Sequence, residues 1–332
     1  MTGPDVLPVA VSCGDPSGIG PEIIAAAWET LRDELPFFMI GDPKHVPAGT
    51  RTAMIDAPAD ARSAMADGLP VLQLAFPKPA RPGHPDPENA PGVVEAIHRA
   101  VELVGKGAAS AICTAPASKR ELVSHAGFAF PGQTEFLAHH AGGGQAVMML
   151  ASAELKVVPV TTHIPISEVS GTLDAELLET TIRVTDRALH EDFGVSEPRR
   201  IAVAGLNPHA GECGVLGLED ATVIAPVCER LRAEGMSIEG PLSADTMFSA
   251  TARAGYDAAI AMYHDQALIP VKTLAFEGGV NVTLGLPIVR TSPDHGTAFD
   301  IAGRGQANPA SMIAALRLAR KIATARLANK CR

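Results

Sequence analysis

The stretch Ala258-Ala259-Ile260-Ala261-Met262-Tyr263-His264-Asp265-Gln266 joins an apolar, strand-like run to a polar turn that carries a histidine. The same arrangement occurs twice earlier in the chain, where residues 156–160 lead to His163 and residues 201–206 lead to His209. Short apolar runs that alternate with helix-like segments are typical of a mostly parallel α/β sheet. We therefore predict an α/β fold in which each of the three histidines follows a buried strand.

The same alternation extends over nearly the whole chain and predicts two domains. Further strands are expected at residues 8–12, 36–40, 69–74, 109–114 and 146–150, and helices from residue 21 and at 92–105, 135–140, 173–191, 220–234 and 309–328. A chain of 332 residues, 46% of them hydrophobic, is long enough for two domains with aliphatic cores. We expect a first α/β domain at residues 1–125 plus 306–332 and a second at residues 126–305.

Composition argues against several classes of protein. The formal net charge of −10 argues against a nucleic-acid groove, but it is compatible with a small anionic substrate held by local cations. The five cysteines show no CxxC spacing and are predicted to be reduced thiols. The N-terminus has no signal-peptide pattern, and no apolar run is long enough to span a membrane. We expect a cytoplasmic protein whose partners include neither nucleic acid nor a membrane.

The three histidines are candidate ligands of a metal. The carboxyl ends of parallel strands share one edge of a sheet, and ligands bind outside that edge. Three imidazoles there can hold one divalent cation and leave positions open for a substrate, as catalysis requires. In the alternative reading, each histidine only caps its strand or bonds a loop carbonyl. Because all three share one placement, we predict a metal site formed by His163, His209 and His264, without a choice among zinc, magnesium, cobalt and manganese.

Two loops are candidates for a nucleotide site. Residues 14–22 join a strand to a helix, where a phosphate loop would lie, but their glycines match neither the dinucleotide nor the P-loop motif and are also compatible with a tight turn. Residues 294–303 are rich in small side chains and resemble the adenosine-binding loop of isocitrate and isopropylmalate dehydrogenases. This resemblance implies that NAD or NADP binds here, with His295, Gly296 and Thr297 as candidate cofactor residues.

Several polar side chains are candidates for binding an anionic substrate. Lys272, Asn281 and Arg290 lie near apolar segments rich in glycine and proline, where a carboxylate or phosphate role is more common than on an ordinary surface. Gln133 and Thr134 lie at the start of a predicted helix, whose free N–H groups favour negative charge. We predict that these five residues bind the substrate, and that Thr134, Lys272 and Arg290 contact its phosphate or carboxylate.

Taken together, these motifs resemble the 4-hydroxythreonine-4-phosphate dehydrogenase family of vitamin B6 biosynthesis. The resemblance rests on segments 14–22, 114–119, 205–212, 240–248, 263–272 and 280–303. It implies two α/β/α domains with a mostly parallel sheet and an interdomain cleft, similar to isocitrate and isopropylmalate dehydrogenases. It also implies a homodimer whose active site is shared between subunits, with the metal site and the dimer interface in the second domain. On this resemblance, His163 and His209 come from one chain and His264 comes from the other.

The resemblance further implies an activity. The expected reaction is the metal-dependent oxidation of 4-phosphohydroxy-L-threonine, a small phosphorylated substrate, by NAD or NADP. The resulting β-keto acid would lose CO2 and give 3-amino-2-oxopropyl phosphate. The sequence leaves the proton acceptor open among Asp245, Asp265 and Lys272, since a carboxylate beside a histidine can also serve only to orient it.

One departure from the family pattern bears on the substrate. Gln133 stands where the family usually has histidine, and glutamine donates a hydrogen bond but neither carries charge nor transfers a proton. Cys213 and Ala267 each replace a usual glycine without removing a predicted ligand. Two other functions stay open: a family paralogue that oxidises a phosphorylated sugar acid or a cis-dihydrodiol carboxylate, and a metal-dependent hydrolase. A non-enzymatic binding protein is disfavoured, because the predicted open metal positions accompany anion-binding groups.

Overall fold

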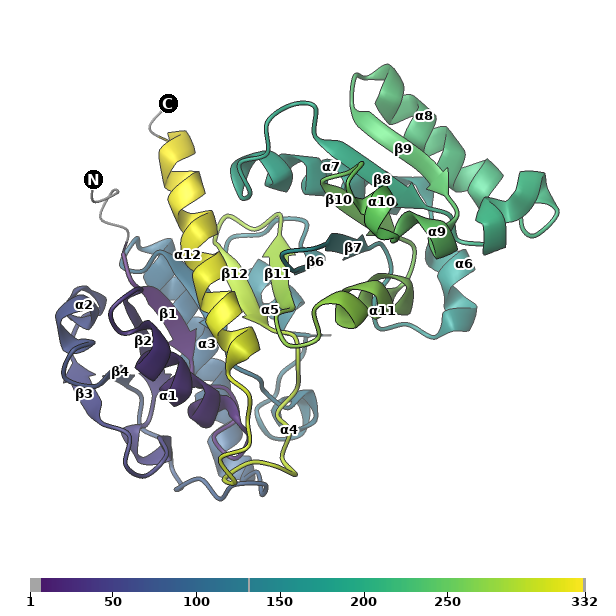
Figure 1. Ribbon diagram of the computed structural model, residues 1–332. Helices are drawn as coiled ribbons and strands as arrows, with labels where there is room; N and C mark the ends of the chain where they lie inside the picture. Colours follow the sequence, from purple (N-terminus) through teal and green to yellow (C-terminus); the bar gives the residue numbers. More distant parts are fainter. Residues whose placement is uncertain (1–6, 131, 331–332) are drawn as a thin grey trace. The chain divides into compact units, whose positions relative to one another are not determined.

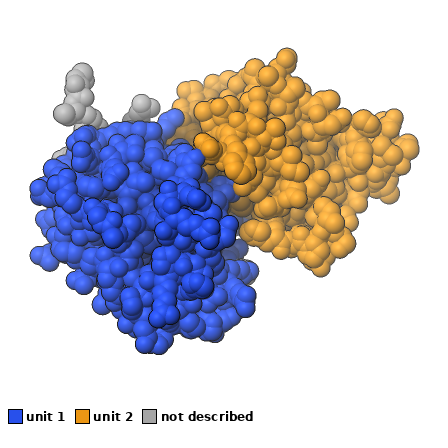
Figure 2. Space-filling model, turned by 60° about the horizontal axis from the view of Figure 1, so that its bottom comes forward, with its two compact units in different colours: residues 1–146, 286–331 blue, residues 147–285, 332 orange. Residues whose placement is uncertain are grey.

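The computed structural model describes residues 7–130 and 132–330 and divides the chain into two compact units. Unit 1 comprises residues 1–146 and 286–331, and unit 2 comprises residues 147–285 (Figure 2). Each unit has its own part of the sheet and its own helices. Unit 2 contains all three histidines that the sequence analysis singled out.

The division between the units differs from the boundaries expected near residues 125 and 305. Residues 126–146 belong to unit 1, because their helix packs against a long helix of that unit. Residues 286–305 also belong to unit 1, because they add a strand to its sheet. The second unit is therefore shorter at both ends than the sequence pattern indicated.

The strands of unit 1 are β1 (Val9–Ser12), β2 (Phe37–Gly41), β3 (Thr52–Ile55), β4 (Leu69–Gln73), β5 (Ala111–Thr114) and β12 (Arg290–Pro293). They lie in the order β3-β4-β2-β1-β5-β12, and neighbouring strands run parallel (Figure 1). The central strands β1 and β2 are buried along their whole length, as expected for a sheet covered on both faces. Because β12 pairs with β5, residues from distant parts of the sequence meet at the ends of these two strands.

The helices of unit 1 are α1 (Gly20–Leu31), α2 (Ala61–Ala64), α3 (Ala90–Gly105), α4 (Lys119–His125), α5 (Gln133–His140) and α12 (Ala310–Lys330). Helix α1 has Pro21 in its first turn, where the missing N–H costs no helical hydrogen bond. Helix α3 buries Val93, Ile97 and Val101 and contacts β1, β2 and β5. The last helix, α12, packs on β12, β5 and α1 and so joins the end of the chain to unit 1.

The strands of unit 2 are β6 (Val147–Ala151), β7 (Lys156–Pro159), β8 (Arg200–Ala204), β9 (Ser237–Leu242), β10 (Ala258–Ala261) and β11 (Val280–Leu284). They lie in the order β11-β6-β7-β10-β8-β9. Strand β6 is antiparallel to both of its neighbours, whereas β7, β10, β8 and β9 are parallel. The prediction of a mostly parallel α/β fold is therefore confirmed, and the three strands that lead to histidines are consecutive in the sheet.

The helices of unit 2 are α6 (Val169–Thr172), α7 (Ala175–Glu191), α8 (Ala225–Ala233), α9 (Ala244–Met247), α10 (Ala250–Arg253) and α11 (His264–Leu274). Helix α11 begins at His264 and buries Ala267, Leu268 and Val271 in the core. Alanines of β8 and β10 share that core, and their small side chains let the helix lie close to the sheet. Packing thus holds the first residue of α11 at the end of β10.

Some elements differ from the sequence expectation. The apolar pattern did not predict β3, β9, β11 or β12. Strand β3 is largely exposed, and β12 is buried although its residues Arg290–Pro293 are mostly polar, so neither has the periodicity of a typical strand. The helix expected at 220–234 begins as a π-helical turn, Asp220–Ile224, which α8 continues.

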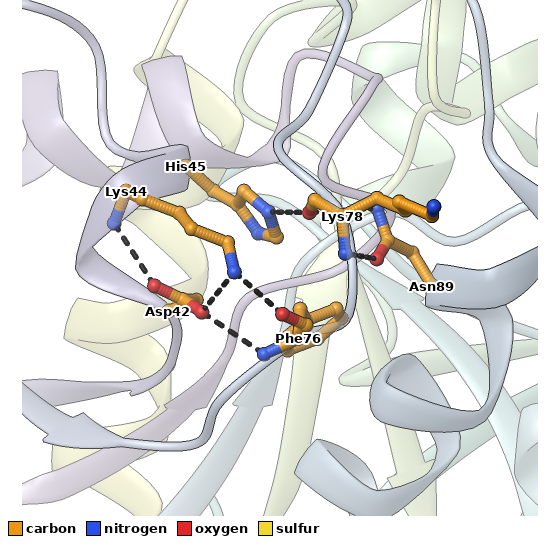
Figure 3. A network of polar contacts seen from close by, with 6 residues as sticks. All are labelled: Asp42, Lys44, His45, Phe76, Lys78 and Asn89. Atoms are coloured by element: carbon orange, nitrogen blue, oxygen red, sulfur yellow. Dashed lines mark hydrogen bonds and ion pairs between the residues drawn. The ribbon is translucent and has the colours of Figure 1, made fainter.

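A polar network attaches the proline-rich stretch after β4 to the end of β2 (Figure 3). Asp42 is buried and accepts a hydrogen bond from the main-chain N–H of Phe76 at 2.9 Å. Lys44 Nζ lies 2.9 Å from the same carboxylate. His45 Nε2 lies 2.9 Å from the main-chain oxygen of Lys78. The network fixes the path of a segment that would otherwise have few regular hydrogen bonds.

The cysteines agree with the expectation of reduced thiols. Cys13, Cys113 and Cys228 are buried and free, Cys213 is exposed and free, and Cys331 lies outside the described residues. Burial raises the pKa of the Cys13 thiol to about 12, so it is protonated at neutral pH. Within the described residues, no helix combines the length and the apolar character needed to cross a membrane.

Candidate active site

Two of the predicted metal ligands lie side by side at the carboxyl edge of the unit 2 sheet. His163 follows β7, and His264 is the first residue of α11, directly after β10. Strands β7 and β10 are parallel neighbours, which brings their ends together. The imidazole centroids of His163 and His264 are 5.4 Å apart, with an angle of 45° between the rings. Both line a cavity of about 310 Å³, together with Thr161, Tyr263 and Asp265.

Hydrogen bonds between the loops hold the three strand ends in register. Thr161 Oγ1 donates to the main-chain oxygen of Met262 at 2.8 Å, which joins the end of β7 to that of β10. Gln266 Oε1 accepts from the N–H of Met262 at 2.6 Å, and its Nε2 donates to the oxygen of Gly205 at 2.8 Å. Gln266 thereby joins the end of β10 to that of β8. Neither Thr161 nor Gln266 was predicted from the sequence to have this role, although both lie in the histidine-bearing motifs.

His209 lies in a segment of unusual backbone conformation after β8. Every residue from His209 to Cys213 has a positive φ, and the four that are not glycine have φ between 41° and 57°. His163 also has a positive φ, of 48°. Side chains with a Cβ rarely adopt this left-handed conformation, and such strain gathers at functional sites. Two of the three predicted ligands therefore sit on backbone that the surrounding structure must hold in place.

Two carboxylates lie near predicted metal ligands: Asp265 contacts His264, and Asp245 lies close enough to His209 to interact with it electrostatically. Asp265 Oδ1 lies 2.7 Å from His264 Nδ1, an arrangement that orients an imidazole and leaves its Nε2 for a metal. Asp245 Oδ1 accepts from the hydroxyl of Ser243 at 2.6 Å. This hydrogen bond, with a smaller contribution from His209, holds the pKa of Asp245 below its ordinary value. Asp245 is therefore ionised at neutral pH, and Asp265 is better suited to orientation than to proton transfer.

The donor set fits a divalent cation, but one chain does not complete it. The paired imidazoles of His163 and His264 are of the type that binds zinc, cobalt or manganese. Within residues 7–130 and 132–330, however, no group of three or more histidine, cysteine, aspartate or glutamate side chains is arranged to hold a metal. The structure of one chain thus brings two of the three predicted ligands together, and not all three.

Two of the predicted substrate-binding residues lie in unit 2. Lys272 is on α11, two turns beyond His264, and its Nζ lies 5.8 Å from the centroid of the exposed Phe276 ring. Asn281 is in β11, and its buried Oδ1 accepts no hydrogen bond from any described residue. A buried amide oxygen of this kind is costly unless a ligand or water donates to it.

The other predicted substrate-binding residues meet in unit 1. Arg290, at the start of β12, is only 4% exposed. Its Nη2 donates to Thr114 Oγ1 at 2.8 Å and to Gln133 Oε1 at 3.4 Å. Gln133 and the half-buried Thr134 open α5, whose N-terminal N–H groups favour an anion. Burial lowers the pKa of Arg290 to about 10, so its guanidinium keeps its charge at neutral pH.

The two candidate nucleotide loops contact each other within unit 1. The N–H of Ile19 donates to the oxygen of Thr297 at 3.0 Å. A Cβ added to Gly18 would lie 2.8 Å from the same oxygen, so only glycine fits there. The loop before α1 also turns on Asp15, whose Oδ1 accepts from the N–H of Ser17 and whose pKa is raised by burial. These contacts favour the tight-turn reading of residues 14–22 over a phosphate loop.

The loop at residues 294–303 keeps an exposed edge. His295 and Gly296 are exposed, and a Cβ added to Gly296 would meet no atom within 4 Å. Thr297 is half-buried against the loop before α1. Farther along, the N–H of Gly303 donates to Glu22 in the first turn of α1. The loop is therefore anchored at both ends, while His295 and Gly296 face solvent.

Comparisons with known proteins agree with these observations. The family model of the pyridoxal phosphate biosynthetic protein PdxA matches residues 33–319. The 4-hydroxythreonine-4-phosphate dehydrogenase of Paracoccus denitrificans (strain Pd 1222) is 57% identical over 327 residues, which cover 97% of this chain and 99% of that protein. The crystal structure of the 4-hydroxythreonine-4-phosphate dehydrogenase from Klebsiella pneumoniae is 40% identical, with a TM-score of 0.85, and the match covers 96% of this chain and 99% of that one.

A solved structure with a different name is more distant. The terephthalate 1,2-cis-dihydrodiol dehydrogenase from Burkholderia xenovorans LB400 is 28% identical, with a TM-score of 0.62, over 95% of this chain and 98% of that one. The family match and the high identity to its members extend over nearly the whole chain. This chain therefore belongs to the PdxA family of pyridoxal phosphate biosynthetic proteins, and it is an enzyme of the oxidoreductase class.

Proposed function

We propose that this enzyme oxidises 4-phosphohydroxy-L-threonine with NAD or NADP, in the cytoplasm, as a step of pyridoxine 5'-phosphate biosynthesis. The product is a β-keto acid that loses CO2 to give 3-amino-2-oxopropyl phosphate. The name and 57% identity of the Paracoccus relative support the substrate. The structural observation that carries the proposal is the placement of His163 and His264 at the ends of neighbouring parallel strands, beside a cavity that both line.

One divalent metal, held by His163, His209 and His264, belongs to the proposed site. When bound, such a cation stabilises negative charge that develops on a substrate oxygen. Asp265 orients the imidazole of His264 through its Nδ1 and leaves Nε2 as the ligand atom. The left-handed turns present His163 and His209 in directions that regular strand or helix backbone would not allow.

The proposed site is completed by a second copy of the chain. Three ligands are needed, and within residues 7–130 and 132–330 of one chain no three such side chains are arranged to hold a metal. Large apolar side chains are exposed close to the histidines in sequence: Val215 and Phe276 are each 78% exposed, and Ile269 and Leu218 are each 63% exposed. Exposed apolar side chains mark an interaction surface where they lie together, and we take these four as candidates for one. We assign them to the interface of a homodimer in which His163 and His209 of one chain are joined by the partner subunit's His264.

The substrate is held through its charged ends. Arg290 offers a buried, charged guanidinium, and Thr134 and the N–H groups of α5 add donors beside it. Gln133 accepts a hydrogen bond from Arg290 with its Oε1, and its Nε2 amide group donates to the anion. Lys272 adds a second cation, and Asn281 offers its buried oxygen to a donor on the substrate.

Asp245 and Lys272 are our candidates for the proton acceptor. Asp265 is committed to His264 by a 2.7 Å contact and acts as an orienting group. The lowered pKa of Asp245 keeps its carboxylate ionised at neutral pH, and thus free to accept a proton, but also makes it a weak base. The dinucleotide, which accepts the hydride when bound, is assigned to the exposed edge of the loop at residues 294–303, through His295, Gly296 and Thr297.

A second candidate substrate is a cis-dihydrodiol carboxylate. The observation in its favour is the 28% identical terephthalate 1,2-cis-dihydrodiol dehydrogenase, which matches over nearly the whole chain. Gln133 is neutral, so it contributes less than a cationic side chain would to the binding of a dianionic phosphate. A paralogue that binds a carboxylate group, with its single negative charge, in place of the phosphate would tolerate this residue more easily.

The deciding experiment compares substrates on one preparation of the enzyme. NADH or NADPH formation is followed with 4-phosphohydroxy-L-threonine, a phosphorylated sugar acid and a terephthalate cis-dihydrodiol, each with and without added Zn²⁺, Mg²⁺, Co²⁺ or Mn²⁺. We expect the highest kcat/KM with 4-phosphohydroxy-L-threonine, together with CO2 release and loss of activity after chelation. A higher kcat/KM with the dihydrodiol would establish the paralogue, and product formation without any dinucleotide would establish a hydrolase.

A further inference from the structure

A buried carboxylate of the next helical segment accepts hydrogen bonds from the residues just before His209. Asp220 is 2% exposed and is the first residue of the π-helical turn that leads into α8. Its Oδ1 accepts from the N–H of Leu206 at 2.8 Å. Its Oδ2 accepts from the N–H of Asn207 at 3.1 Å and from Asn207 Nδ2 at 2.9 Å. One side chain thus satisfies three donors immediately before Pro208 and His209.

Glycines around the carboxylate show how closely it is fitted to the turn. A Cβ added to Gly205 would lie 2.6 Å from Asp220 Oδ1 and 2.7 Å from Ala210 Cα. A Cβ added to Gly211 would lie 3.2 Å from Asp220 Oδ2. A Cβ added to Gly217 would lie 2.3 Å from Asn207 Nδ2. The backbone before and after His209 is therefore packed directly around Asp220.

This packing accounts for a conformation that local preferences oppose. The residues His209, Ala210, Glu212 and Cys213 all have left-handed φ values although each has a Cβ. Such a run persists only where surrounding contacts determine it. Within the turn itself, the N–H of Ala210 donates to the oxygen of Asn207, the residue whose own N–H and side chain are held by Asp220. The Asp220 carboxylate thus fixes the position of Leu206 and Asn207, directly before the left-handed run begins.

We propose that Asp220 is a positioning residue, which holds His209 in its left-handed conformation and thereby sets the affinity of the site for its divalent metal. Asp220 touches neither substrate nor metal in this proposal, and it acts only through the N–H groups of residues 206 and 207 and the side chain of Asn207. The proposal rests on the proposed function, because it takes His209 as a metal ligand. Residues that orient metal ligands typically change metal affinity by about 10- to 100-fold when they are replaced.

The substitution Asp220→Asn tests the proposal with almost no change in volume. The amide keeps one acceptor oxygen, but its NH2 group faces at least one N–H that now donates to the carboxylate. The matched control is Glu219→Gln, which removes the neighbouring charge but keeps an acceptor for Asn207 Nδ2, now bonded to Glu219 Oε2 at 2.8 Å. Zn²⁺ and Co²⁺ affinities are measured by titration calorimetry on the metal-free full-length protein, and activity is measured as a function of metal concentration.

We expect Asp220→Asn to weaken metal binding about 10-fold or more, and Glu219→Gln to leave it within about twofold of wild type. The activity of Asp220→Asn should recover most of its kcat at saturating metal, which a general loss of structure would not allow. A metal affinity of folded Asp220→Asn within twofold of wild type would overturn the proposal.

A second variant covers the case in which Asp220→Asn does not fold. Gly211→Ala disturbs the same turn two residues after His209. The new Cβ would contact Asp220, and a φ of 78° is strained for a residue with a Cβ. It should also weaken metal binding, and an unchanged affinity would count against the proposal. A wild-type protein that binds no metal, or a His209→Ala variant with unchanged affinity, would instead refute the metal role in the proposed function.

Discussion

Removal of the Arg290 guanidinium should weaken substrate binding far more than it weakens folding. Arg290 is 4% exposed, and its Nη2 donates to Thr114 and Gln133 at the end of β5 and the start of α5. An anion bound here exchanges its water for a charge-assisted hydrogen bond worth about 1.5–3 kcal/mol. Arg290→Ala should therefore lower kcat/KM for the phosphorylated substrate by about 10- to 100-fold.

The loss should appear mainly in KM, because Arg290 binds a part of the substrate that does not react. Arg290→Lys keeps the charge but cannot place two donors at once, so it should recover only part of the loss. Arg326→Ala is the matched control, since Arg326 is an arginine of the same unit whose Nη1 donates to the oxygen of Leu286. Initial rates of NADH formation over a range of substrate concentrations give kcat and KM for the four proteins.

Thermal unfolding separates binding from stability in this series. Arg290→Ala leaves Thr114 and Gln133 without a buried donor, so a moderate loss of stability is expected, and rates are therefore compared well below the unfolding temperature. A loss of kcat/KM below twofold in folded Arg290→Ala would show that the anion binds elsewhere. An equal loss in Arg326→Ala would show that the effect is structural.

Three further predictions follow from individual side chains. Gln133→His should keep kcat/KM for the phosphorylated substrate within about threefold, since imidazole can also donate a hydrogen bond, and a loss above tenfold in steady-state assays would count against that role. His209→Ala should remain folded by circular dichroism yet lose most bound metal and nearly all turnover, and normal activity after metal depletion would contradict the metal site. Burial lowers the pKa of His45 in the folded protein. As the pH falls below the ordinary value of 6.5, the unfolded chain therefore binds a proton at His45 before the folded chain does, and the free energy of unfolding decreases from that pH downward. Urea unfolding should show that the free energy of unfolding decreases less between pH 7.5 and pH 5.5 in His45→Gln than in wild type. An equal decrease would show that His45 is not the source of the pH dependence.

Much of this site was predictable because strand ends are visible in the sequence. The apolar runs before His163, His209 and His264 are long enough to identify as strands, and the common edge of a parallel sheet then brings their ends together. The structure places β7, β10 and β8 side by side, and His163 lies against His264. The family resemblance, which rested on motifs in a fixed order, is confirmed by the family match.

Other features depend on contacts that local sequence does not encode. Nothing in the preferences of histidine, alanine, glutamate or cysteine predicts a left-handed run, because the packing around Asp220 imposes it. Thr114 accepts a hydrogen bond from Arg290 only because β12 pairs with β5 from far along the chain. The boundary between the units was misjudged for the same reason: β12 is polar and short, so its place in the sheet of unit 1 was not visible in the sequence.

The central claim is a three-histidine metal site shared between two subunits, and mixed dimers test it most directly. Differently tagged His163→Ala, His209→Ala and His264→Ala chains are combined in the three possible pairs, and the mixed dimers are assayed for NADH formation. If His163 and His209 come from one chain and His264 from the other, each pair that includes His264→Ala has one intact site in every mixed dimer.

Random reassortment makes about half of the dimers mixed, so up to about a quarter of all sites should recover in those two pairs, for a dimer with two-fold symmetry. The pair His163→Ala with His209→Ala should recover nothing. If only the pair His163→Ala with His264→Ala fails to recover activity, His163 and His264 of each site come from the same chain and His209 comes from the other. If purified mixed dimers of all three pairs stay inactive, the shared site is contradicted, and each chain must build its metal site alone.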